Sequence, residues 1–112
     1  MNSNAELKVR TEEIRNDIEH MVEMCGSMWE SDTLVDYLDD AEVEYRINSK
    51  LEYVGAYIYI ELGGATTWID TYHKTLESSW GSYKASVPLS LLAVETIDSL
   101  MREYYNCTRD AR

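Results

Sequence analysis

The sequence of 112 residues has no phenylalanine, a single proline and only two cysteines. Cys25 and Cys107 are too few to form the disulfide framework of a small secreted domain, and we expect both to stay reduced in a cytosolic protein. The two histidines add too few ligands for a recognisable zinc pattern. We therefore expect no structural disulfide, no metal and no other cofactor.

Basic residues are also scarce, with 10 Lys and Arg against 21 Asp and Glu, giving a net charge of −11. Proteins that bind nucleic acid or anionic membranes need clustered Lys and Arg, so we expect neither as a direct partner. A small soluble domain usually carries a net charge of magnitude about 2 to 8. The excess predicts a partner with a basic surface.

Long apolar runs are missing as well, because none approaches the roughly 18 residues of a membrane span. The N-terminal stretch, MNSNAELKVRTEE, is polar and acidic, unlike a signal peptide. We therefore expect a protein of the host cell cytosol with no membrane partner. The apolar content of 45% favours a folded chain, and the length suits one domain over residues 1–112.

Helical spacing of apolar residues predicts three helices. The first covers residues 4–26, with Asn4 as its cap and Gly26 at its end. Its apolar stripe is formed by Leu7, Thr11, Ile14, Ile18, Met21 and Cys25. A short acidic helix covers residues 32–41. The last helix follows Pro88, has Ser90 as its candidate cap and ends near Tyr105.

From Val43 onward the apolar residues alternate with polar ones, which indicates strands. In "EYVGAYIYIEL" the alternation predicts one aliphatic face and one face with Tyr53, Tyr57, Tyr59 and Glu61. Gly63-Gly64 and Gly81-Ser82 are typical hairpin turns. The predicted fold class is α+β: an antiparallel sheet of about five strands with an N-terminal helix, a short acidic helix and a C-terminal helix.

The most unusual segment is "ESDTLVDYLDDAEVEYR", in which every charged residue before Arg46 is acidic. Helical spacing puts Asp32, Asp36, Asp39 and Asp40 on one face, and strand alternation puts Glu42 and Glu44 on one side. Such a run is either a solvated surface that aids solubility or a target for a basic groove. Ordered carboxylates resemble the charge that duplex DNA presents to its binding proteins.

The tyrosine face has two interpretations. Tyrosine is favoured at protein interfaces, so Tyr53, Tyr57 and Tyr59 are candidates for an exposed binding surface. Alternatively, this face packs under a helix, with the hydroxyl groups at the rim.

Few residues suggest catalysis or metal binding. Asp70 and His73 in "IDTYHK" form a conceivable general base or metal pair, but a polar turn with a surface histidine is the preferred interpretation. The acidic stretch lacks the glycine and the alternate ligands of an EF-hand loop. We therefore predict that the protein is not an enzyme.

The stretches "YVGAYIYIELGGATTWIDT" and "SSWGSYKASVPLS" resemble small acidic proteins carried by phages and mobile elements of gut Firmicutes. The resemblance covers roughly residues 35–105, and its shared motifs are structural. Small acidic phage proteins include the anti-CRISPR and antirestriction inhibitors, several of which imitate DNA. The resemblance therefore implies an inhibitor, without implying any particular active residue.

Together these features predict an inhibitory binding protein, an anti-CRISPR that uses an acidic, DNA-mimicking surface to block the nucleic-acid groove of a Cas effector nuclease such as Cas9. The alternative is a non-catalytic homodimeric interaction module of a phage or mobile element, joined by the tyrosine face or by the stripe of the first helix. The predicted partner-binding residues are Glu30, Asp32, Asp36, Asp39, Asp40, Glu42, Glu44, Tyr53, Tyr57 and Tyr59.

Overall fold

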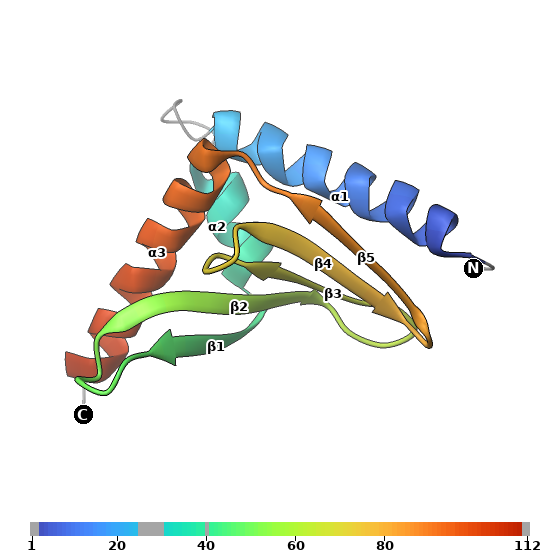
Figure 1. Cartoon of the computed structure of the whole chain (residues 1–112). Coiled ribbons are helices and arrows are strands. Elements are labelled where there is room, and N and C mark those ends of the chain that lie inside the picture. The colour runs from blue at the N-terminus through green and yellow to red at the C-terminus, as the bar shows by residue number, and fades with distance from the viewer. Residues whose placement is uncertain (1–2, 25–30, 40, 111–112) are drawn as a thin grey trace.

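The computed structural model describes residues 3–24, 31–39 and 41–110 (Figure 1). Within these ranges, three helices and five strands follow in the order α1, α2, β1 to β5, α3. Their bounds are α1 Asn4–Met24, α2 Ser31–Asp39, β1 Glu42–Ile47, β2 Tyr53–Glu61, β3 Thr66–Asp70, β4 Thr75–Trp80, β5 Tyr83–Pro88 and α3 Leu91–Asp110. The predicted α+β fold is therefore confirmed.

The strands form an antiparallel meander in the order β1-β2-β3-β4-β5, so each strand pairs with its neighbour in sequence. Glycines with positive φ lie in two of the predicted turns: Gly63, with φ of 129°, and Gly81, with φ of 57°. Side chains other than glycine rarely adopt these angles. The short turns leave β1 and β5 as the two edges of the sheet.

The helices of the described part all pack on one face of this sheet. Helix α1 lies along β4 and β5, α2 packs against α1, and α3 packs against β2 (Figure 1). The core between the two layers includes Ile18, Leu34, Leu38, Ile58, Ile69, Leu76, Ile97 and Met101. No described element covers the opposite face of the sheet, which we call the open face.

The first helix begins at Asn4, as we predicted, but a different residue caps it, and the predicted end at Gly26 lies outside the described residues. The Ser3 Oγ accepts a hydrogen bond from the Glu6 amide at 3.1 Å, so Ser3 rather than Asn4 is the cap. The Asn4 side-chain oxygen instead accepts the Lys84 amide of β5 at 3.1 Å. Asn4 therefore ties the start of α1 to the sheet.

The last helix begins as predicted and ends later. The Ser90 Oγ accepts the Ala93 amide at 3.1 Å, which confirms Ser90 as the cap. The helix continues past Tyr105 to Asp110, because the polar segment that follows Tyr105 contains neither glycine nor proline to end it. The Tyr105 hydroxyl donates to the Leu51 carbonyl at 2.6 Å, which fixes α3 against the β1–β2 turn.

Strand β2 carries an extra residue relative to each neighbour. Against β1 the extra residue is Val54, and against β3 it is Ile60. Such a bulge reverses the alternation of side chains beyond it. Tyr53 and Glu61 therefore turn toward the helices, and the prediction that both share a face with the central tyrosines of β2 is wrong.

Candidate functional site

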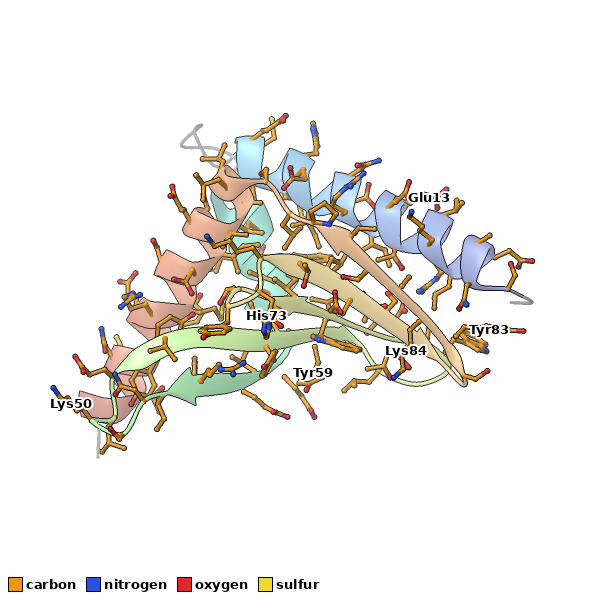
Figure 2. All side chains as sticks on the ribbon, viewed as in Figure 1. Glu13, Lys50, Tyr59, His73, Tyr83 and Lys84 are labelled. Atoms are coloured by element: carbon orange, nitrogen blue, oxygen red, sulfur yellow. The ribbon has the colours of Figure 1, made fainter. Side chains whose placement is uncertain are left out.

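The open face carries a row of four side chains across β1 to β4. The strand register places Glu42 opposite Tyr59, Tyr59 opposite Trp68, and Trp68 opposite Glu77. Figure 2 shows the Tyr59 side chain on the side of the sheet away from α1, whose outer surface carries Glu13. The row thus begins and ends with a carboxylate and has two aromatic rings between them.

The two rings of this row, which we call the aromatic pair, are adjacent. The centroids of Tyr59 and Trp68 lie 6.2 Å apart, with 39° between the ring planes. Both side chains are only half-buried, although each belongs to an inner strand of the sheet. Because no described element packs over them, their outer faces are available to another molecule.

Carboxylates dominate the surroundings of Tyr59. Glu42 and Glu44 are exposed on the open face of β1, and within the described part neither forms an ion pair. Burial raises the pKa of the Tyr59 phenol, and the Glu44 and Glu42 carboxylates raise this pKa further. The phenol therefore stays neutral at physiological pH, and the charge around it is negative.

Arg46 lies on the same face of β1 but is already engaged. Its guanidinium carbon lies 4.1 Å from the ring centroid of Tyr72 and 5.9 Å from that of Tyr57, and it donates a hydrogen bond to the Tyr57 hydroxyl. Gly55 makes this cluster possible, because a Cβ there would lie 2.9 Å from the Cβ of Tyr72. Arg46, the first basic residue after the acidic stretch, is thus held by tyrosine side chains.

Tyr53, a predicted partner-binding residue, lies in the helix layer and is 6% exposed. Its hydroxyl donates to Asp98 of α3 at 2.6 Å, and Arg102 of α3 stacks on its ring at 4.9 Å. Burial and the hydrogen bond to Asp98 raise the pKa of Tyr53. Both interpretations of the tyrosine face thus apply to different residues: Tyr53 packs under a helix, whereas Tyr57 and Tyr59 lie on the open face.

The predicted acidic surface is divided between two layers. Asp36 is exposed on α2 in the helix layer, whereas Glu42 and Glu44 lie together on the open face, as their alternation predicted. Glu30 and Asp40 lie outside the described residues. The side chains of Asp32 and Asp39 also lie outside the described part. Among the predicted acids, therefore, the structure places Glu42 and Glu44 beside the aromatic pair.

Asp70 and His73 do meet in the structure. One Asp70 oxygen lies 2.6 Å from the His73 Nδ1, and the other accepts the His73 amide at 2.9 Å. Asp70 is 5% exposed, whereas the imidazole is largely exposed. The two hydrogen bonds close the β3–β4 turn, in which Lys74 adopts a φ of 64°. This contact accounts for both residues as parts of a turn.

A metal centre requires several ligands that converge. Over residues 3–24, 31–39 and 41–110, no group of three or more His, Cys, Asp or Glu side chains is placed to hold a metal ion. None of the helices, over these same ranges, has both the length and the apolar character needed to cross a bilayer.

The sequence prediction missed Trp68 as a member of the site. Alternation in "TTWIDT" puts Trp68 and Asp70 on one face, but only the strand register shows that Trp68 neighbours Tyr59. The irregular register at Ile60 made this neighbour difficult to predict. The roles of Arg46 and Tyr72 were missed for a similar reason, because they meet across Gly55 from separate strands and turns.

Comparison of the chain with protein-family models, with curated protein sequences and with solved structures finds no match.

Proposed function

We propose that this chain is a non-catalytic inhibitor whose open face docks on the basic nucleic-acid-binding groove of another protein. The observation that carries the proposal is the aromatic pair, Tyr59 and Trp68, lying uncovered between Glu42 and Glu77. Aromatic side chains are favoured anchors of protein interfaces, and carboxylates around them select a cationic partner.

The net charge of −11 supports a basic protein as the partner. Nucleic acids and anionic membranes would be repelled, whereas a groove lined with Lys and Arg would be attracted over a distance of about 10 Å at moderate salt. Electrostatic steering also accelerates association at low salt. A groove that binds phosphates is therefore a natural target for this surface.

Within this proposal the target class is a Cas effector nuclease, and the chain acts as an anti-CRISPR in the cytosol of the host cell. These nucleases hold a guide–target duplex in a positively charged channel and read a short DNA motif with arginines. Occupying that channel inhibits the nuclease without any chemical step. The resemblance to small acidic phage proteins supports the same class.

A second candidate is a homodimeric interaction module that uses the open face, which is favoured by the uncovered rings of Tyr57 and Tyr59. A homodimer joined through the apolar stripe of α1 is excluded, because Leu7 and Ile18 of that stripe are fully buried within the protein itself. Two copies joined face to face would bring Glu42 and Glu44 toward like charges, which disfavours association. The inhibitor is therefore the better-supported function.

A pull-down with washes of increasing salt concentration tests the proposed function. Tagged protein is incubated with a lysate from cells that express a Cas nuclease, and the beads are washed at low and then at high salt. We expect a guide-binding nuclease to be retained at low salt, released at high salt and displaced by heparin. Retention of no nucleic-acid-binding protein, together with a dimer in size-exclusion light scattering, would favour the homodimer.

A further inference from the structure

We infer that the aromatic pair, Tyr59 and Trp68, is the binding site for an arginine side chain of the partner protein. This inference rests on the proposed function and names the chemistry that the open face recognises. A guanidinium stacks on aromatic rings and also forms forked hydrogen bonds to carboxylates. The row from Glu42 to Glu77 offers both kinds of group next to each other.

The protein already holds two of its own arginines in this way. Arg102 stacks 4.9 Å from the Tyr53 ring centroid while its Nη2 lies 3.6 Å from an Asp98 carboxylate oxygen. Arg46 stacks 4.1 Å from the Tyr72 ring and donates to the Tyr57 hydroxyl. In both cases the guanidinium combines a ring face with an oxygen acceptor.

The aromatic pair has the same parts without an arginine of its own. Glu42 and Glu44 lie beside Tyr59, and over the described residues neither has a basic partner. On the other side of the pair, Glu77 is held in place by a hydrogen bond from the Ser86 hydroxyl. An arginine laid across the rings therefore finds a carboxylate at either end of the row.

The surface beside the rings is hollowed on both sides. A hollow of about 290 Å³ lies next to Tyr59 where the open face meets α2, and its lining includes Glu42, Glu61 and Tyr37. A second hollow, of about 390 Å³, lies next to Trp68, and its lining includes Glu77 and Lys84. Each hollow thus combines one ring of the aromatic pair with at least one carboxylate, and the second hollow also includes the Lys84 side chain. Side chains that flank a docked arginine have room to enter these hollows.

Arginine fits this site better than the other cationic side chain. The lysine ammonium is a compact, strongly hydrated charge that neither stacks on rings nor forms a planar fork. A nucleic-acid base also stacks on aromatic rings, but its phosphates would meet Glu42 and Glu44. The discrimination between arginine and lysine is therefore the property that identifies the site.

The test uses the full chain labelled with ¹⁵N and two octapeptides, one of alternating Arg and Ser and one of alternating Lys and Ser, at low salt. Chemical shifts of the Trp68 indole N–H report binding at millimolar peptide concentration. We expect the arginine peptide to bind about fivefold more tightly than the lysine peptide, because only the guanidinium stacks on the rings and forms forked hydrogen bonds to the carboxylates. Equal affinities, or no shift of the Trp68 indole, overturn the inference.

Variants locate the effect. Because the Trp68 variants lack the indole N–H, peptide binding to every variant is followed by the backbone amide shifts of β2 and β3. Trp68→Leu and the double variant Glu42→Gln with Glu44→Gln should each remove the preference for arginine, whereas Trp68→Phe, which keeps a ring, should retain most of it. Glu13→Gln with Glu23→Gln on α1 removes the same number of charges as the open-face double variant, and this matched control should behave as the unaltered protein. Backbone amide shifts away from the open face verify that each variant is folded. Retention of the preference in folded Trp68→Leu overturns the inference.

Inhibition of the captured nuclease separates this inference from the proposed function. Suppose that Trp68→Leu inhibits as well as the unaltered protein, while reversal of the charges at Glu42 and Glu44 abolishes inhibition. The inferred arginine-binding site is then wrong, and the proposed function stands. If neither change affects inhibition, the open face is not the docking surface, and both fail.

Discussion

The rings of Tyr59 and Trp68 lie 6.2 Å apart on the open face, on neighbouring strands whose register pairs the two residues directly. This relationship exists because β2 and β3 form a hairpin and no described helix reaches that side of the sheet. It gives an acidic protein a small apolar surface within a negative field. Anchoring and electrostatic steering can therefore come from the same site.

The phenylalanine substitution of Tyr53 should destabilise the protein without affecting the open face. It removes the hydrogen bond of 2.6 Å to Asp98, which also accepts the Thr71 hydroxyl at 2.9 Å. Loss of a hydrogen bond to a charged acceptor should lower the free energy of unfolding by about 1–3 kcal/mol. Urea denaturation at pH 7 measures this loss, and an unchanged midpoint would contradict the assigned hydrogen bond.

Tyr53 should also make the free energy of unfolding depend on pH in the alkaline range. Burial and the Asp98 hydrogen bond raise the pKa of Tyr53 in the folded state above the value of about 10 for unfolded tyrosine. The unfolded chain therefore releases a proton that the folded chain retains. The contribution of Tyr53 is complete below about pH 10 and is lost as the pH rises beyond it. Urea midpoints from pH 8 to 11 should fall less steeply for Tyr53→Phe than for the unaltered protein.

Gly55→Ala should destabilise the sheet and displace Tyr72. A Cβ at this position would lie 2.9 Å from the Tyr72 Cβ and 3.3 Å from its Cα, so the backbone must move. Overpacking of this kind costs about 1–3 kcal/mol. Thermal unfolding measures the loss. Adding Tyr72→Gly to Gly55→Ala should recover part of the lost stability. If the stability losses of the two single variants simply add in the double variant, the proposed clash is contradicted.

His73→Ala tests whether the contact between Asp70 and His73 has a catalytic role. The substitution removes the imidazole that lies 2.6 Å from Asp70 but leaves the His73 amide hydrogen bond that closes the turn. We expect inhibition of the captured nuclease to remain within about twofold, because His73 belongs to the β3–β4 turn and not to the row from Glu42 to Glu77. Loss of inhibition in a folded variant would support a catalytic role instead.

The sequence predicted the order and type of the elements because their patterns are local. Spacing of three and four identified the helices, alternation identified the strands, and paired turn residues marked the hairpins. Ser90 was recognisable as a cap from its position after Pro88. Asn4 and Ser3 are both good caps, and only the contact of Asn4 with Lys84 decides between them.

The composition of the site was less predictable, because it depends on irregularities in β2. The extra residues at Val54 and Ile60 leave no distinct signal in a strand that otherwise alternates. They turn Tyr53 into the helix layer and determine the register that brings Trp68 beside Tyr59. Which face the helices cover is also a tertiary property, since Tyr57 and Tyr59 would suit either environment.

Charge reversal on opposite layers is the most direct test of the open face as the docking surface. Inhibition of the captured nuclease is measured for Glu42→Lys with Glu44→Lys and for Glu13→Lys with Glu23→Lys on α1. Both pairs change the net charge equally, and circular dichroism confirms folding. We expect inhibition to weaken about 100-fold for the open-face pair and to change little for the α1 pair. Equal inhibition by the two folded variants, or a loss confined to the α1 pair, would contradict docking through the open face.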